Sequence, residues 1–221
     1  MYPQNRKTLE LYYDALHDYA RDVGQFPETL MDLTRPPAGR AGWKGPYLPS
    51  LPNDAWSRPF VYERMETGPY PYRLASTGAN GQPWDEDDYP IDDVRRNRME
   101  RDLKAYTLAV VLFRTHVGRY PTTEEGLRSL FVQPQGAGGW RGPYAPKVLR
   151  DPWNRDFHYS LELREGEPYF DVWTQGPDAA ASTDDIHIRD IPGTEQFFIP
   201  EGEIERELAR LRGQQPHDQS E

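Results

Sequence analysis

The chain has 221 residues, no cysteine and a formal net charge of −10 at pH 7. An acidic chain without basic runs is repelled by nucleic-acid phosphates and by anionic membrane surfaces, and without cysteine it forms neither disulfides nor thiolate metal sites. The longest apolar run, Leu108–Phe113, falls far short of the about 18 to 20 residues that cross a bilayer, so we expect no nucleic-acid partner and no membrane contact by these residues.

Two amphipathic helices are predicted at equivalent points of the chain. In each, five apolar residues recur at positions i, i+3, i+7, i+10 and i+14, which places their side chains on one helix face. They are Leu9, Tyr12, Leu16, Tyr19 and Val23 in the first helix, and Leu103, Tyr106, Val110, Phe113 and Val117 in the second. Gly24 and Gly118 follow directly, and each precedes an aromatic residue and a proline, so both helices end there.

The match between the two helices extends into a repeat of the whole chain. Further segments recur in the same order, namely Trp43 with Gly45-Pro46-Tyr47 and Asp54 with Trp56 in the first copy, and Trp140 with Gly142-Pro143-Tyr144 and Asp151 with Trp153 in the second. Because the same motifs recur in the same order over most of the chain, the sequence indicates a tandem duplication.

An antiparallel hairpin is predicted near the end of each copy. In the second copy, Phe157–Leu163 alternates apolar and polar residues, so that Phe157, Tyr159, Leu161 and Leu163 should face the core, and Tyr169–Trp173 returns beside it. In the first copy, Phe60–Glu63 and Tyr72–Ala75 flank Gly68-Pro69 in the same way. A helix stripe and one face of a small sheet can cover each other, so we expect an α+β fold of two units with long ordered loops.

The predicted domain limits follow from the repeat. The first unit is expected at residues 1–95 and the second at 96–192, with a C-terminal extension at 193–221. In the extension, Ile204, Leu208 and Leu211 at i, i+4 and i+7 predict a short amphipathic helix that docks on its own domain or on a partner, and self-docking is favoured. From Gly213 onward the polar composition predicts disorder.

The recurring motifs of the two copies resemble those of a known protein family. The second copy contains Gly118-Arg119-Tyr120-Pro121-Thr122-Thr123-Glu124-Glu125-Gly126-Leu127, then Trp140-Arg141-Gly142-Pro143-Tyr144 and Asp151-Pro152-Trp153. In this order, after an amphipathic helix, these segments resemble the globular head domain of the major (G-type) pseudopilin of type II secretion systems. The first copy is a degraded version that keeps Trp43-Lys44-Gly45-Pro46-Tyr47.

The resemblance implies a structural or assembly subunit of a pseudopilus or related pilus-like system that works in protein secretion with other pseudopilin or secretion-system subunits. Members of the family begin with an apolar helix that anchors them in the inner membrane, and these 221 residues contain no such segment. With an anchoring helix ahead of Met1, the expected location is the periplasmic face of the inner membrane in the bacterial cell envelope. The alternative is a soluble module that uses a duplicated head fold to bind a protein or a glycan.

The same resemblance implies a calcium ion in the loop that follows the last strand of each copy. The oxygen-bearing side chains there are Thr174, Asp178, Asp184 and Asp185 in the second copy and Ser76, Asn80, Asp87 and Asp88 in the first. Calcium takes about 6 to 8 hard oxygen ligands, which side chains and backbone carbonyls of a loop can supply together. The alternative is a solvated acidic loop with Asx turns, because turns select the same residue types.

Catalytic patterns are absent from the sequence. The five histidines are scattered, and no His-x-x-x-His, Gly-x-Ser-x-Gly or phosphate-binding glycine loop occurs. We therefore expect no enzyme. The Trp-x-Gly-Pro-Tyr segments are interpreted as aromatic packing that holds each long loop against its sheet, in preference to a ligand platform.

Overall fold

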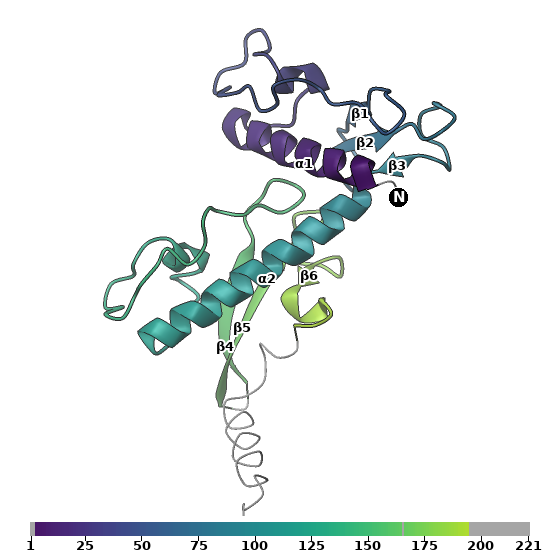
Figure 1. Cartoon of the computed structure of the whole chain (residues 1–221). Coiled ribbons are helices and arrows are strands. Elements are labelled where there is room, and N and C mark those ends of the chain that lie inside the picture. The colour runs from purple at the N-terminus through teal and green to yellow at the C-terminus, as the bar shows by residue number, and fades with distance from the viewer. Residues whose placement is uncertain (1–2, 165, 195–221) are drawn as a thin grey trace, which may run out of the picture. The chain divides into compact units, whose positions relative to one another are not determined.

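The computed structural model describes residues 3–164 and 166–194 and has the expected α+β fold (Figure 1). The helices are α1 (Pro3–Val23) and α2 (Asp92–Val117), with the short 3-10 helices η1 (Leu30–Leu33), η2 (Leu127–Leu130) and η3 (Ile188–Asp190). The strands are β1 (Val61–Arg64), β2 (Tyr72–Ser76), β3 (Tyr89–Pro90), β4 (His158–Arg164), β5 (Glu167–Thr174) and β6 (Ile186–His187). Both predicted helices and both predicted hairpins are confirmed.

The strands form two sheets of three, ordered β1-β2-β3 and β4-β5-β6. In the first, Val61 pairs with Ala75, and Ser76 pairs with Tyr89 on the short strand β3. In the second, His158 pairs with Trp173 across the β4–β5 hairpin. The outer strands β3 and β6 span only two residues each, so they carry no alternation that a sequence pattern could reveal.

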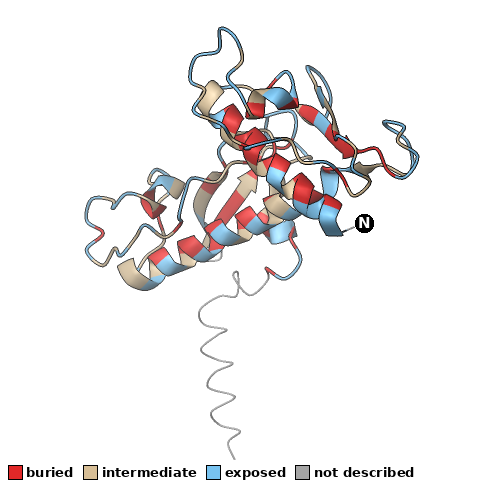
Figure 2. Cartoon of the chain, turned by 45° about the horizontal axis from the view of Figure 1, so that its top comes forward, coloured by how far each residue is buried: buried red, intermediate tan, exposed pale blue. Residues whose placement is uncertain are grey.

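The core around α1, here called the α1 core, contains the predicted helix stripe. Leu9 and Leu16 are fully buried and pack with Phe26, Phe60 and Tyr72, which come from the following loop and sheet. The phenol of Tyr62 on β1 donates a 2.7 Å hydrogen bond to the carbonyl of Pro27, so the loop after α1 is tied to the sheet. Figure 2 shows the buried face of each helix in red and its solvent face in pale blue.

The second helix and sheet repeat this arrangement. Val110 and Phe113 of α2 are fully buried, and so is Val172 of β5. Tyr159 is buried as predicted and donates a 2.8 Å hydrogen bond to the carbonyl of Pro121, the counterpart of the Tyr62 bond. The prediction for the end of β4 is wrong, because Leu163 is 76% exposed. It pairs with Pro168 at the far end of the hairpin, beyond the reach of the helix.

The first turns of α2 belong to the α1 core. Val94 is part of that core, and Arg95 is 2% exposed and donates a 2.5 Å hydrogen bond from its guanidinium to the carbonyl of Tyr72. The described chain divides into two compact units within α2, after Asp102. One unit also takes in Val148–Phe157 and Thr174–Asp185, and the other joins Leu103–Lys147 to His158–Trp173 and the chain from Ile186. The domain limits at residues 95 and 192, which were drawn from the repeat, stay a prediction.

Two expectations concern segments beyond these elements. The predicted helix at Ile204–Leu211 and the rest of the extension from residue 195 lie outside the described residues. Among the helices that the structure describes, none has the length and apolar character needed to cross a membrane.

Candidate functional site

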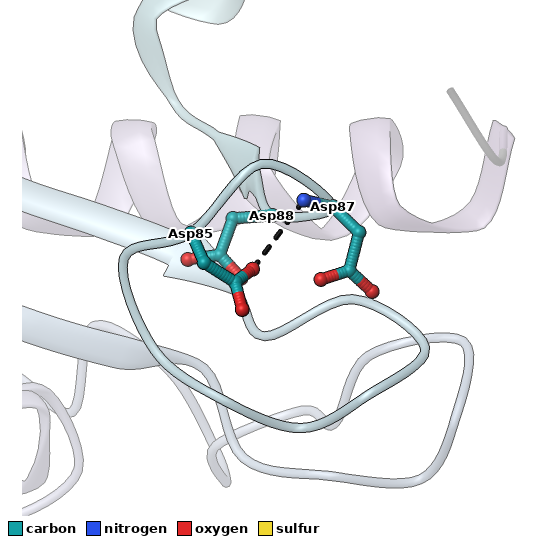
Figure 3. A group of neighbouring side chains, drawn as sticks. All are labelled: Asp85, Asp87 and Asp88. Carbon is teal, nitrogen blue, oxygen red and sulfur yellow. Dashed lines mark hydrogen bonds between the residues drawn. The ribbon is translucent and has the colours of Figure 1, made fainter.

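Three acidic side chains converge in the loop between β2 and β3. One oxygen each of Asp85, Asp87 and Asp88 lies within 4.8 Å of the others, with Asp85 exposed and the other two half-buried (Figure 3). The backbone N–H of Asp87 donates a 3.3 Å hydrogen bond to the carboxylate of Asp85, which links two of the three residues. Within residues 3–164 and 166–194, no other three acidic or histidine side chains lie close enough together to share one metal ion.

Backbone N–H groups hold the two half-buried carboxylates in place. Asp87 Oδ2 accepts hydrogen bonds from the amides of Ala79 (2.7 Å) and Asn80 (3.1 Å), and the bond from Asn80 is the main cause that lowers the pKa of Asp87. Asp88 Oδ2 accepts a 2.5 Å bond from the amide of Trp84, while burial raises the pKa of Asp88. Their Oδ1 atoms are shielded from solvent and accept no hydrogen bond from any residue that the structure describes.

Glycine allows both acidic loops to close tightly. Gly78 has a φ of +62°, and a Cβ atom there would lie 2.4 Å from the carbonyl oxygen of Asp87 and 2.5 Å from its Oδ2. Gly176 has a φ of +61°, and a Cβ atom would lie 2.5 Å from Oδ2 of Asp184. The left-handed backbone and the close approach of a carboxylate both require a residue without a side chain.

The predicted ligands Ser76 and Thr174 form hydrogen bonds with aspartates outside the acidic loops. The Ser76 hydroxyl donates a 2.7 Å hydrogen bond to Asp54, and the Thr174 hydroxyl donates a 2.6 Å bond to Asp151. All four side chains are buried, so each hydroxyl is bonded to a buried carboxylate in the turn that precedes its hairpin. Through these bonds the two hydroxyls anchor the ends of β2 and β5.

Asn80 contacts the acidic group through its amide nitrogen. Its Nδ2 donates a 2.8 Å hydrogen bond to Asp85, and its Oδ1 accepts a 2.6 Å bond from the amide of Gln82. In this geometry Asn80 orients Asp85 and closes the turn, with its oxygen already engaged.

The acidic side chains of the second loop lie in two turns, Asp178 in one and Asp184 with Asp185 in the other. Asp178 accepts a 2.9 Å hydrogen bond from the amide of Ala180, and Asp185 accepts a 3.3 Å bond from the amide of Ser182. Asp184 accepts a hydrogen bond from the Ser182 hydroxyl. In the described chain these three carboxylates form no group within 4.8 Å, so the structure brings together the acids of the first loop and not those of the second.

Two acidic positions gained a role that the sequence reasoning did not give them. Asp85 was missed as a candidate ligand, although it begins the run Asp85-Glu86-Asp87-Asp88, and that run was the available signal. Asp54, named above only as part of the repeat, accepts hydrogen bonds from the amides of Trp56 and Arg58, both at 2.9 Å, and so closes the turn before β1. Its bond to Ser76 crosses from the turn to the end of β2, which no local pattern indicates.

An arginine connects each Asp-x-Trp turn to the glycine of the acidic loop. Arg58 donates from its guanidinium to the carbonyls of Gly78 (2.9 Å) and Ala79 (3.1 Å), and Arg155 donates in the same way to the carbonyl of Gly176. These carbonyls therefore already accept a hydrogen bond from an arginine guanidinium. An ion in the first loop would draw its ligands from the carboxylates, from water and from other carbonyls of the loop.

The aromatic loop segments pack as predicted. Trp43 donates a 2.9 Å hydrogen bond from its indole to the carbonyl of Asp32, and its ring meets Tyr47 edge to face at 5.7 Å. Trp140 and Tyr144 repeat this arrangement, with a 2.9 Å bond from the indole to the carbonyl of Ser129. With their polar tips bonded and their rings against each other, these residues hold the loops in place.

A pairing of histidine and carboxylate joins β5 to β6. His187 Nδ1 lies 2.8 Å from the buried carboxylate of Asp171, which also pairs with Arg189 at 3.1 Å. The imidazole stacks on Trp173 with centroids 5.8 Å apart. These contacts account for His187 as a structural residue that fixes the edge of the sheet.

Comparison with known proteins gives a consistent result over both copies. The family described as "Type II secretion system (T2SS), protein G" matches the chain twice, at residues 2–94 and 90–191. Type II secretion system core protein G of Klebsiella pneumoniae is 32% identical over 96 residues, which cover 41% of this chain and 67% of that protein. The corresponding protein of Xanthomonas campestris pv. campestris is 35% identical over 79 residues, 35% of this chain and 54% of that protein.

A solved structure is also similar. The crystal structure of the major pseudopilin from the type 2 secretion system of enterohaemorrhagic Escherichia coli shares 29% identity, covers 43% of this chain and 87% of that chain, and gives a TM-score of 0.38.

Proposed function

The chain belongs to the type II secretion system protein G family, and from this premise we propose that it is a structural subunit of a secretion pseudopilus or a related pilus-like assembly. The observation that carries the proposal is the double match, at residues 2–94 and 90–191. Each match contains one helix with one three-stranded sheet, so the chain supplies two heads where a relative such as the Klebsiella pneumoniae protein aligns with one. Its partners are other subunits of the secretion system, and its place is the bacterial cell envelope.

Cross-linking in cells tests the assembly role. A photo-reactive residue placed at an exposed position of the chain, in its own host, should form adducts with subunits of the secretion system. A stable, well-expressed chain that forms adducts only with unrelated proteins or glycans would contradict the proposal and favour a free-standing binding module.

The first acidic loop is proposed to bind calcium. Asp85, Asp87 and Asp88 offer three hard carboxylates within 4.8 Å, and two of their oxygens accept no hydrogen bond from the described residues. Carboxylates this close suit a divalent cation, because the cation offsets their mutual repulsion and can supply a partner to oxygens that lack a hydrogen bond. Bound there, the ion would hold the loop between β2 and β3 in its closed form.

The second loop is proposed as a weaker site for the same ion. Asp178, Asp184 and Asp185 each accept a hydrogen bond within their own turn, so they must reorient before they can share an ion. That reorganisation lowers the affinity relative to a loop whose carboxylates already converge.

Calorimetric titration of calcium into the chelator-treated chain tests both loops. We expect D87N/D88N to remove the tighter binding event and D184N/D185N, the matched pair in the other copy, to remove the weaker one. Magnesium serves as the control ion, since it requires a stricter octahedral site. Unchanged calcium binding in D87N/D88N would refute the assignment of the first loop.

A further inference from the structure

A pocket lies beside β2 in the first of the two units. Its walls come from the β1–β2 turn, from β2 itself, from the loop between β2 and β3, and from the first turn of α2, and it encloses about 380 Å³. The rings and guanidinium groups that line it are those of Tyr70, Tyr72, Arg73, Trp84 and Arg95. This volume is at the lower end of the range for ligand pockets, so the pocket has room for one small group.

One wall of the pocket is an arginine stacked on a tryptophan at the protein surface. The guanidinium carbon of Arg73 lies 3.8 Å from the centroid of the Trp84 ring. The Arg73 side chain is 46% exposed and Trp84 is 37% exposed, so another molecule can reach both. Glu63 pairs with Arg73 at 3.5 Å, but its side chain is 51% exposed, and an ion pair in such a position holds the guanidinium only weakly.

The backbone of the loop keeps the Trp84 ring at this surface. Trp84 has a φ of +67°, and its amide donates a 2.5 Å hydrogen bond to the carboxylate of Asp88. A left-handed backbone is uncommon for a bulky residue and persists where the surrounding structure imposes it, and residues of this kind cluster at functional sites. The fold therefore holds a large ring beside Arg73 at a conformational cost.

A second, buried arginine lines the pocket from α2. The guanidinium carbon of Arg95 lies 4.3 Å from the ring centroids of both Tyr70 and Tyr72, and Arg95 is 2% exposed. Asp92, the acidic residue among those that line the pocket, pairs with Arg95 at 2.9 Å. The Nε of Arg95 is shielded from solvent and finds no acceptor among the residues that the structure describes. The pocket therefore combines aromatic rings with positive charge in a chain whose net charge is −10.

The second copy uses the equivalent position differently. Arg73 directly precedes the residue that pairs with Tyr62 across the first hairpin, and Asp171 has the same place relative to Tyr159 in the second. Asp171 is buried and pairs with two basic side chains from β6 and η3. The loop at residues 178–185 contains no aromatic residue. The second copy thus fills this position with its own groups, whereas the first presents a guanidinium and a large ring to solvent.

We propose that the pocket binds one aromatic side chain of a partner protein, with its ring against the Arg73 guanidinium. A guanidinium attracts the face of an aromatic ring, and Leu74 and Pro90 add apolar surface to the same pocket. Tyrosine, tryptophan and arginine are also the residues that dominate binding energy where proteins anchor a side chain in a partner's pocket. The inference goes beyond the role in secretion and is tested on the isolated chain, so its failure would leave the assembly proposal untouched.

Titration of the full ¹⁵N-labelled chain with two blocked tripeptides, followed by NMR, tests the proposal. One peptide is acetyl-Gly-Phe-Gly-amide, and the other carries cyclohexylalanine in place of phenylalanine, which keeps the bulk and removes the aromatic face. We expect the phenylalanine peptide to shift the indole N–H signal of Trp84, assigned with Trp84→Phe, and to bind about fivefold more tightly than its counterpart. No shift at about 10 mM peptide would overturn the proposal, because even millimolar sites are then filled.

A matched pair of arginine variants locates the effect. Arg73→Met keeps an unbranched side chain and removes the cation, so the preference for phenylalanine over cyclohexylalanine should disappear. Arg164→Met is the control, because the Arg164 side chain is 47% exposed and lies 3.5 Å from the Tyr169 ring on the hairpin of the second copy, and this variant should keep the preference. A preference that survives in Arg73→Met, or that is lost equally in both variants, would overturn the assignment to this pocket.

Discussion

The hydroxyl of Thr174 donates a 2.6 Å hydrogen bond to the carboxylate of Asp151, and both side chains are closed off from solvent. The other oxygen of Asp151 accepts the amides of Trp153 (3.0 Å) and Arg155 (2.8 Å). One buried aspartate thus joins the turn before β4 to the end of β5. Ser76 and Asp54 make the same connection in the first copy, at 2.7 Å.

Replacing Thr174 with valine should test how much this connection stabilises the fold. The change keeps the shape of the side chain and removes the hydroxyl, so a buried carboxylate loses a donor. We expect the free energy of unfolding in urea to fall by about 1 to 3 kcal/mol. Thr174→Ser keeps the donor and is the control; unchanged stability in Thr174→Val would mean that the hydrogen bond does not stabilise the fold.

Replacing Gly78 with alanine should destabilise the fold more than replacing Gly24 with alanine. Both glycines have positive φ, +62° and +86°, so both variants carry the backbone cost of about 1 kcal/mol. Only the Cβ at Gly78 meets the carboxylate of Asp87, at 2.5 Å, whereas nothing lies within 4 Å at Gly24. Thermal unfolding should rank Gly78→Ala below Gly24→Ala, and the reverse order would contradict the close packing of the loop.

The Glu125 carboxylate should make stability depend on pH. Arg119 donates two hydrogen bonds to it, at 2.6 and 2.7 Å, and this pairing lowers the pKa of Glu125. A carboxylate with a lowered pKa in the folded state stabilises it above the unfolded pKa, and that contribution is lost as pH falls through the folded value. Because the Arg119 side chain is 40% exposed, the contribution should be below about 1 kcal/mol.

Urea unfolding of Glu125→Gln at several pH values checks this expectation. The variant should be less stable than the natural chain at pH 7, and the difference should shrink as the pH falls through the lowered pKa of Glu125, where its carboxyl becomes neutral like the amide of the variant. Glu162→Gln, on the exposed hairpin, is the control and should leave the pH profile unchanged. A constant difference between Glu125→Gln and the natural chain at every pH would rule out the ionic origin.

The Arg95 side chain should contribute far more to the stability of the fold than the side chain of its neighbour Arg96. Its guanidinium stacks on the rings of Tyr70 and Tyr72, both at 4.3 Å, and donates to the backbone of β2. Arg95→Ala leaves a buried carbonyl and two aromatic faces without their partner, so we expect a loss of at least about 2 kcal/mol. Arg96 is 63% exposed, and Arg96→Ala should change stability by no more than about 0.5 kcal/mol. Similar unfolding midpoints would contradict the placement of Arg95 in the α1 core.

Local patterns in the sequence determined the helices, the hairpins and the duplication. The buried stripe from Leu9 to Tyr19 and its repeat from Leu103 to Phe113 were predicted because a helix places every third or fourth residue on one face. The stops at Gly24 and Gly118 followed from the left-handed backbone that only glycine adopts without strain, and φ values of +86° and +82° confirm it. Each of these features depends on residues that are neighbours in the chain.

Tertiary structure alone decided which oxygens meet. Ser76 and Thr174 looked like loop ligands, yet their hydroxyls turn to Asp54 and Asp151, about twenty residues earlier in the chain. The two acidic loops have similar sequences, but only the first draws three carboxylates together in the described chain. Periodicity is set by the backbone of a single element, whereas the position of a side-chain oxygen is set by whichever buried partner satisfies it, and that partner comes from another part of the fold.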